Sequence, residues 1–227
     1  CGYHAITFGH LIGELVRRIT GKSLGTFFRE EVAGPLNADF HIGFGPEHDH
    51  RVAEMIPPPI LEPGDPGYVE MPPDSMLVKT LTNPPVTYDC LKERSWRDAE
   101  IPAANGHGNA RAIARAGAVM ACGGELDGVR LMGFETVEKA IEEQIYDTDL
   151  CLGIPIRYGL GFGLNSKDTP MGPNPRTFWW GGMGGSAVIM DLDARLSLAY
   201  VMNKMAPDMI GDIRSVRLGQ AVYESLA

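Results

Sequence analysis

The chain has 227 residues and a mass of 24.6 kDa, enough for one large domain or two small ones with a proper hydrophobic core. Its formal net charge of -9, without a basic stripe, makes it a poor candidate for binding nucleic acid or an anionic membrane. No apolar run approaches the roughly 20 residues of a membrane-spanning helix, and we favour a cytoplasmic location.

The first residues predict an αα-hairpin. Apolar residues recur at steps of three and four between Phe8 and Ile19, which predicts an amphipathic helix closed by Gly21. Ser23 is a good N-cap for a second helix, which Gly34-Pro35 stops. We expect the apolar faces of both helices to be buried.

Residues 40–100 form a long irregular excursion punctuated by prolines, with short helical pieces. A loop of this length often serves as a lid or as a wall of a substrate site. His48-Asp49-His50 suggests a metal site, but no third ligand stands at helical or hairpin spacing. We therefore expect a solvated loop there, and no metal.

A second candidate site precedes the next helix. Asn109 is a good N-cap for a helix over 110–122, and another helix is predicted over 135–144. Asn105 and His107 stand in a glycine-flanked turn just before the first of these helices, where anions and polar substrates can dock. The alternative is that His107 only stabilises the turn.

The pattern changes after residue 150. Alternating or apolar segments predict strands over 157–164, 177–180, 186–190 and 196–202, followed by a helix over 208–226. Short connections favour an antiparallel meander, so the fold class is α+β. We expect a mostly helical region over 1–150 and the strands with the last helix over 151–227, as one structural unit.

A glycine-rich run, Phe178 to Ser186, joins two of these strands. Four of the five residues at 181–185 are glycine, which indicates either a plain tight hairpin or a place where a ligand approaches bare main chain. Exposed N–H groups there could stabilise an oxyanion. The run matches no phosphate-loop motif, and we expect no cofactor.

Several motifs in this order resemble one family. They are Tyr3-His4-Ala5, Phe28-Arg29-Glu30-Glu31, Ala104-Asn105-Gly106-His107-Gly108-Asn109-Ala110-Arg111, Tyr158-Gly159-Leu160-Gly161-Phe162 and Trp180-Gly181-Gly182. Together they resemble the serine β-lactamase-like superfamily, in particular class C-like esterases and β-lactamase-related hydrolases. The resemblance covers nearly the whole chain.

The resemblance implies roles for particular residues. Tyr3 matches the tyrosine that helps to move protons, with Ala5 where the lactamases have asparagine. Trp180-Gly181-Gly182 matches the esterase form of the motif on the strand that edges the site, and the N–H of Met183 would be one oxyanion donor. Trp180 in place of lysine favours a plain ester or a small acyl substrate over penicillins.

One family motif is absent from these 227 residues. The family's nucleophile and its lysine stand in Ser-x-x-Lys, yet no lysine of the chain has a serine three residues before it. Because the chain opens at Cys1 directly before a helical pattern, we expect that the true start lies upstream and that this chain is the C-terminal part of such an enzyme; whether an upstream segment supplies Ser-x-x-Lys is not written in these residues. Alone, the chain should have no covalent activity.

Two alternatives to this hydrolase remain open. One is a non-catalytic domain that binds small acyl ligands, or associates with itself through an open sheet edge. The other makes Cys1 an N-terminal nucleophile, with its own α-amine as base. The remaining cysteines are scattered and show neither metal spacing nor the density of a disulfide scaffold.

Overall fold

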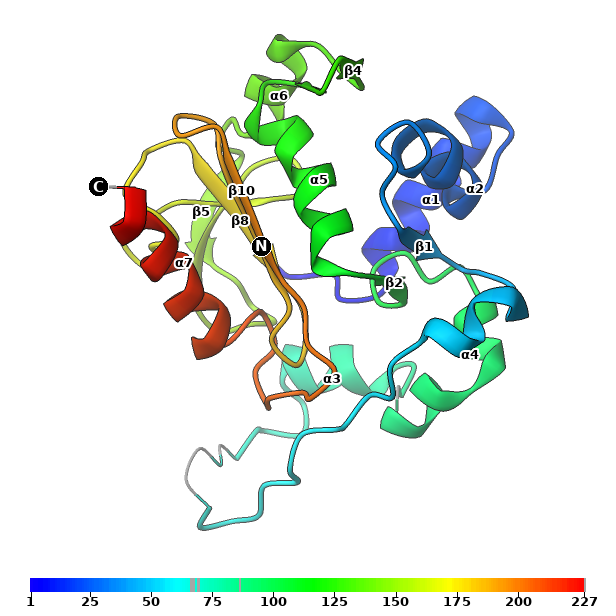
Figure 1. The fold of residues 1–227 in the computed structure, drawn as a ribbon. Coiled ribbons are helices and arrows are strands. Elements are labelled where there is room, and N and C mark those ends of the chain that lie inside the picture. Colours follow the sequence, from blue (N-terminus) through cyan, green and yellow to red (C-terminus); the bar gives the residue numbers. More distant parts are fainter. Residues whose placement is uncertain (66–67, 69, 86, 227) are drawn as a thin grey trace.

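The computed structural model describes residues 1–65, 68, 70–85 and 87–226. Its centre is a six-stranded antiparallel sheet in the order β10-β9-β8-β7-β6-β5 (Figure 1). Its strands are β5 (Ile145–Thr148), β6 (Pro155–Tyr158), β7 (Gly163–Leu164), β8 (Thr177–Gly181), β9 (Ala187–Asp191) and β10 (Leu196–Tyr200). The predicted α+β class and antiparallel meander are confirmed.

Helices cover both faces of this sheet, and shorter elements lie beside it (Figure 1). The α-helices are α1 (Thr7–Thr20), α2 (Leu24–Phe28), α3 (Met76–Thr82), α4 (Arg94–Asp98), α5 (Ala110–Ala121), α6 (Phe134–Ala140) and α7 (Ile213–Leu226). Other short elements are the π-helical turn η1 (Arg29–Ala33), the 3-10 turns η2 (Pro46–Arg51) and η3 (Tyr88–Lys92), and the strand pairs β1 (Phe40–Ile42) with β2 (Gly106–Gly108) and β3 (Glu125–Leu126) with β4 (Val129–Arg130).

Helix α5 joins the two halves of the core. A Cβ atom at Gly117 would lie 2.5 Å from the Ser197 hydroxyl, so the bare backbone of α5 packs directly on β9 and β10. Met120 and Ala121 belong to the apolar cluster between α5 and the sheet, whereas Ala112 and Val119 belong to a second cluster with the segment after α2. Gly219 of α7 packs on the opposite face of the same strands.

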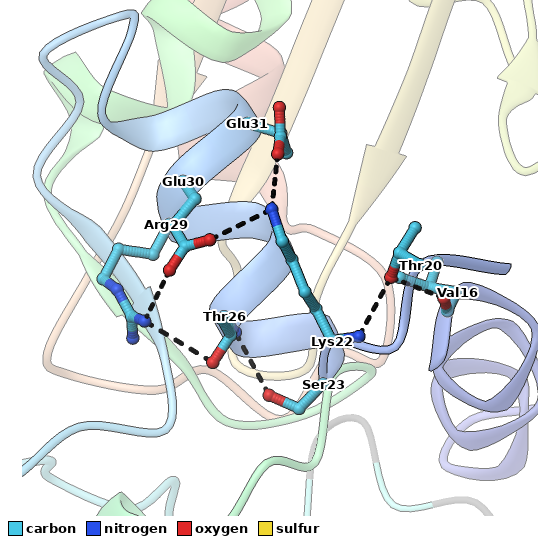
Figure 2. A network of polar contacts seen from close by, with 8 residues as sticks. All are labelled: Val16, Thr20, Lys22, Ser23, Thr26, Arg29, Glu30 and Glu31. Carbon is cyan, nitrogen blue, oxygen red and sulfur yellow. Dashed lines mark hydrogen bonds and ion pairs between the residues drawn. The ribbon is translucent and has the colours of Figure 1, made fainter. Parts of the chain in front are cut away.

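The predicted helical hairpin forms, with the expected caps. Gly21 ends α1 with a left-handed φ of 74°. The Ser23 hydroxyl accepts from the N–H of Thr26 at 3.3 Å. Figure 2 shows how Lys22 then reaches over the turn, with its ammonium 2.7 Å from the carboxylate of Glu31 and 3.1 Å from that of Glu30. Local chemistry therefore fixes this turn.

The expectation that the apolar face of α1 is buried is wrong. The helix meets the rest of the chain through its glycines: Gly9 packs against Ala103, and Gly13 faces Leu24. The larger side chains lie on another face and stay exposed by 38–81%; they are Phe8, Leu11, Ile12, Leu15 and Ile19. We call these five residues the α1 stripe. Periodicity identified the stripe but could not tell whether anything covers it.

Three predicted boundaries also need correction. The strand over 157–164 is two strands, because the chain turns at Gly161, with a φ of 86°, and the Gly159 N–H bonds back to the Phe162 carbonyl at 2.9 Å. The helix over 135–144 ends at Ala140, since β5 pairs with β6 immediately afterwards. The last helix begins at Ile213 rather than at residue 208.

The excursion over 40–100 contains short helices, as predicted. The pairing of β1 with β2 was not predicted, because it joins segments more than sixty residues apart, Phe40 with Gly108. Among the residues that the structure describes, no helix is long and apolar enough to cross a membrane.

A buried carboxylate organises the far end of β8 and β9. Asp191 is fully buried, and its oxygens accept from the Tyr223 and Thr177 hydroxyls at 2.8 Å and 3.0 Å. Asn174 and the N–H groups of Asp193 and Ala194 also donate to it, at 2.9–3.0 Å. Burial raises the pKa of this carboxyl, but the hydrogen bonds outweigh burial and hold the pKa below its usual 3.8.

We predict that Asp191→Asn lowers the free energy of unfolding by about 3 kcal/mol at neutral pH, because it leaves buried donors without an acceptor. Since the folded pKa of Asp191 is lowered, its contribution is complete above about pH 4 and is lost as the pH falls through the folded pKa. Urea unfolding over a pH series measures both effects. The exposed pair of Asp193 with Arg176 provides the control, since Asp193→Asn should cost less than about 1 kcal/mol. Equal losses in both variants would contradict the prediction.

Candidate active site

The glycine-rich run is the hairpin turn between β8 and β9. Three of its four glycines are required by close packing or by a positive φ. A Cβ atom at Gly181 would lie 2.4 Å from the main chain of Ile210, while Gly184 and Gly185 have φ values of 88° and 120°. Gly182, by contrast, has room for a side chain. The turn is thus a tight hairpin on which a second segment, after β10, lies closely.

Main-chain hydrogen bonds hold this turn, and among the described residues the N–H groups of Met183 and Ser186 take no part in them. The N–H groups of Gly182, Gly184 and Gly185 bond to main-chain carbonyls at 2.7–3.2 Å, and Arg214 donates to the Gly184 carbonyl at 2.8 Å. Within the described part of the chain, the N–H of Met183 donates to no other group. Met183 is also 42% exposed. This N–H group is therefore available to a ligand, as an oxyanion donor must be.

Tyr3 lies beside the end of β8. Its ring centroid is 5.1 Å from that of Trp180, the residue that precedes the glycines. The segment before α1 is held in place by the Leu150 N–H, which donates to the Cys1 carbonyl at 2.9 Å. The structure thus brings the phenol ring from the amino end against Trp180, the residue before the glycine-rich hairpin, although the two are more than 170 residues apart in sequence.

A buried carboxylate and a second tyrosine complete the cluster. Asp149 is fully buried, and one of its oxygens accepts from the N–H groups of Cys151 and Leu152 at 2.9 Å. Its other oxygen accepts from the Tyr158 hydroxyl at 3.0 Å. The Tyr158 ring lies 5.8 Å from that of Trp180. In the sequence, Tyr158 stands out only as part of a motif, and no motif or spacing marks Asp149 as a functional residue.

The electrostatics of the cluster keep both phenols protonated. Burial raises the pKa of Tyr3, the Trp180 side chain lowers it by less, and the Asp149 charge raises it further. Burial and the same carboxylate raise the pKa of Tyr158 strongly. Burial also raises the pKa of Asp149, but main-chain hydrogen bonds from Leu152, Tyr3 and Cys151 and the Tyr158 hydroxyl more than offset this and lower it. At neutral pH the cluster therefore holds one carboxylate and two neutral phenols.

The structure places Asn105 and His107 in a different cluster. Asn105 is buried and uses its amide inside its own turn, accepting from the Ile101 N–H at 3.0 Å and donating to the Trp96 carbonyl at 2.7 Å. The His107 ring stands 4.9 Å from that of Phe44 and pairs with the Asn105 carbonyl at 2.7 Å. In the described residues no contact links either side chain to Tyr3 or Trp180, so their place in the pocket stays a prediction.

The His48-Asp49-His50 segment forms part of η2. Asp49 accepts from Arg97 at 3.2 Å and also pairs with Arg94, so two guanidinium groups occupy its carboxylate. His48 stacks on His41, with ring centroids 4.5 Å apart. No group of three or more potential ligands suited to a metal ion occurs in the part of the chain that the structure describes.

A groove lies elsewhere on the chain. A groove of about 500 Å³ runs between α7 and residues 170–173, over Ile189 and beside Val216 and Tyr223. It is shallow and open, and none of the Tyr3, Trp180 and Met183 group lines it. The chemistry of the hairpin end, rather than the size of a cavity, marks the candidate site.

Comparisons with known proteins agree on one family. The family model described as Beta-lactamase matches residues 1–221. The esterase/beta-lactamase LipL of Mycobacterium tuberculosis (strain ATCC 25618 / H37Rv) is 33% identical over 220 residues, which is 92% of this chain and 49% of LipL. The fold is similar to that of a family VIII carboxylesterase, with a TM-score of 0.86 and 40% identity over 98% of this chain and 58% of that one. A penicillin-binding protein homolog from Caulobacter crescentus gives a TM-score of 0.85 and 38% identity, over 99% and 58% of the two chains.

These matches cover almost all of this chain but only about half the length of the relatives. They follow the ordered motifs from Tyr3 to the last helix, and the observed sheet and helices have the same arrangement as those of the solved relatives. The chain belongs to the β-lactamase family.

Proposed function

We propose that this chain forms the tyrosine and oxyanion side of an acyl-transfer site that hydrolyses small esters. The observation that supports this most is the contact of Tyr3 with Trp180, whose ring centroids are 5.1 Å apart; Trp180 is followed in the same hairpin by Met183, whose N–H donates to no group among the described residues. A proton-handling phenol and a main-chain donor are two of the parts that acyl transfer requires. The third part is a nucleophile.

In this proposal a serine hydroxyl attacks the ester carbonyl and forms a tetrahedral intermediate. The serine proton passes to a neighbouring lysine, and Tyr3 relays a proton to the departing alcohol. The N–H of Met183 donates to the oxyanion, an effect typically of ~10²–10³ in rate for one donor. Water then attacks the acyl-serine and releases the acid.

Trp180 decides the proposed substrate class. Its side chain is neutral and largely apolar, and it stands at the end of β8 where a lysine would offer a cation to a substrate carboxylate. A plain ester has no such carboxylate, so it loses nothing by meeting an indole. We therefore propose small esters rather than β-lactams as substrates.

The serine and the lysine must come from outside these 227 residues, which contain no Ser-x-x-Lys. The relatives are roughly twice as long as the part that this chain covers, with 49% of LipL and 58% of the carboxylesterase matched. We propose that the chain alone is inactive. A hybrid in which the unmatched part of the family VIII carboxylesterase precedes Cys1 would supply the missing groups.

We predict that the chain alone neither hydrolyses p-nitrophenyl esters nor reacts with a fluorophosphonate probe, whereas the hybrid does both. In the hybrid, Tyr3→Phe should lower kcat by roughly 10²–10⁴-fold, because it removes the proton relay. Tyr146→Phe is the matched control: it removes the hydroxyl of another tyrosine–aspartate pair, Tyr146 with Asp168, on the exposed strand β5. Circular dichroism confirms that each variant is folded.

Two outcomes would overturn the proposal. Fluorophosphonate labelling of the chain alone would reveal a nucleophile that we have not assigned. Hydrolysis that survives Tyr3→Phe but is lost when iodoacetamide labels Cys1 would favour the N-terminal nucleophile. The Cys1 thiol is exposed and lies 3.8 Å from the Thr148 carbonyl oxygen. A carbonyl oxygen does not stabilise a thiolate, so we expect slow labelling there.

A specific observation also favours self-association of the chain alone. The α1 stripe exposes five large apolar side chains on one helical face, and β10 ends the sheet with an open edge. Exposed apolar patches and open strand edges both promote pairing. A domain that associates with itself is therefore the second candidate function.

We predict that the chain alone sediments as dimers or larger species at micromolar concentration. The double variant Leu11→Ser with Leu15→Ser should shift it toward the monomer, since these side chains are 60% and 55% exposed. Their exposure also limits the expected loss of stability to about 1 kcal/mol in total. Arg17→Ser with Arg18→Ser, on the polar side of α1, is the control. Unchanged association in the Leu11 and Leu15 variant would shift attention to the edge of β10.

A further inference from the structure

We propose that Asp149 and Tyr158 are a positioning pair, which holds the Tyr3 phenol against Trp180 in the orientation that acyl transfer needs. This inference rests on the proposed function and adds two residues to its site. Neither residue is one that the family motifs assigned to chemistry. Both act through Tyr3 and Trp180, so they are not themselves catalytic residues.

The first support is the way the carboxylate and its loop join three segments. Asp149 sits in the connection between β5 and β6, and it accepts from the main chain of Cys151 and Leu152 at 2.9 Å. It also accepts from the Tyr158 hydroxyl of β6 at 3.0 Å. In the same loop, the Leu150 N–H donates to the Cys1 carbonyl at 2.9 Å, so the loop that carries the anion contacts both the N-terminal segment and a sheet strand.

The second support is the arrangement of the rings. The Trp180 ring lies 5.1 Å from the Tyr3 ring and 5.8 Å from the Tyr158 ring, measured between ring centroids. The Tyr158 hydroxyl donates to Asp149, which fixes the tilt of its ring. The Tyr158 ring, fixed in this way, restrains the indole on which Tyr3 packs. Such restraint favours a single geometry at the reacting atoms.

The third support is that a carboxylate is buried here, although its desolvation is unfavourable. A carboxylate with no exposed surface is expensive to desolvate, and no cation is among the groups that bond to it in the described residues. Its donors are main-chain N–H groups and one phenol, which satisfy both oxygens. The nearby carboxylate also opposes ionisation of Tyr3, so the phenol keeps the proton that it is to deliver.

The test uses Tyr158→Phe and Asp149→Asn, with Tyr146→Phe and Asp168→Asn as controls. In the hybrid enzyme, Tyr158→Phe should lower kcat by roughly 10–100-fold and leave KM within about twofold, as expected when orientation is lost but binding is kept. Tyr146→Phe should change neither constant. A purely structural role would lower the melting temperature without this split between kcat and KM.

A second readout needs no activity. Fluorine NMR of the 227-residue chain labelled with fluorotyrosine reports the titration of Tyr3, whose resonance Tyr3→Phe identifies. Asp149→Asn should move this titration to lower pH, because a nearby negative charge is removed, while Asp168→Asn should not move it.

The outcomes are separable. If Tyr158→Phe keeps full kcat, or if Asp149→Asn leaves the Tyr3 titration unchanged, the positioning pair is wrong. If Tyr3→Phe itself keeps full hydrolysis, the proposed function fails instead. Should Asp149→Asn not fold, Tyr158→Phe still decides the question, since it keeps the ring and removes only one hydroxyl.

Discussion

A buried negative charge holds the candidate site together. Asp149 has no exposed surface, yet the N–H groups of its own loop and the Tyr158 hydroxyl donate to it and keep it ionised. Removing such a charge from water costs several kcal/mol, so the fold must hold the donors in place before the charge is tolerated. The same loop holds the amino end of the chain, because the Leu150 N–H donates to the Cys1 carbonyl. This is how a short irregular segment before α1 can present Tyr3 to the sheet.

Close packing and hydrogen bonds also fix the hairpin at the end of β8. Gly181 leaves room for the Ile210 backbone, and the neighbouring N–H groups are used within the turn or by residues after β10. Among the described residues, the N–H of Met183 has no acceptor in the turn or in the segment after β10. A donor that is preorganised in this way needs no rearrangement when charge develops on a substrate, which is the condition for effective oxyanion stabilisation.

Local signals predicted the parts of the fold that local chemistry decides. Ser23 and Asn109 cap helices as expected, and Gly21 closes α1 in a left-handed conformation. Where the outcome depends on a distant partner, the sequence was insufficient. The helix predicted to reach Gln144 stops early because β5 pairs with β6, and β1 finds β2 across more than sixty residues. Burial of the α1 stripe was predicted wrongly for the same reason, since periodicity defines a face and not its cover.

The same distinction applies to the site. Tyr3 and Trp180-Gly181-Gly182 were identified because motifs in one order resembled a family, and the structure shows them in contact. Asp149 could not be identified from the sequence. The groups that lower its pKa come from Cys151, Leu152, Tyr3 and Tyr158, and no linear pattern shows that these residues surround one carboxylate.

This missed residue also bears on the chemistry of Tyr3. A general base works best when its pKa lies near the operating pH, and a phenol reaches that range only beside a cation. The influences on Tyr3 in the described structure are burial, Trp180 and the Asp149 anion, and together they raise its pKa. With tryptophan rather than lysine at position 180, the strand adds no positive charge. Under the proposed function, the phenol therefore donates or relays a proton, and the base that first activates the nucleophile is another group.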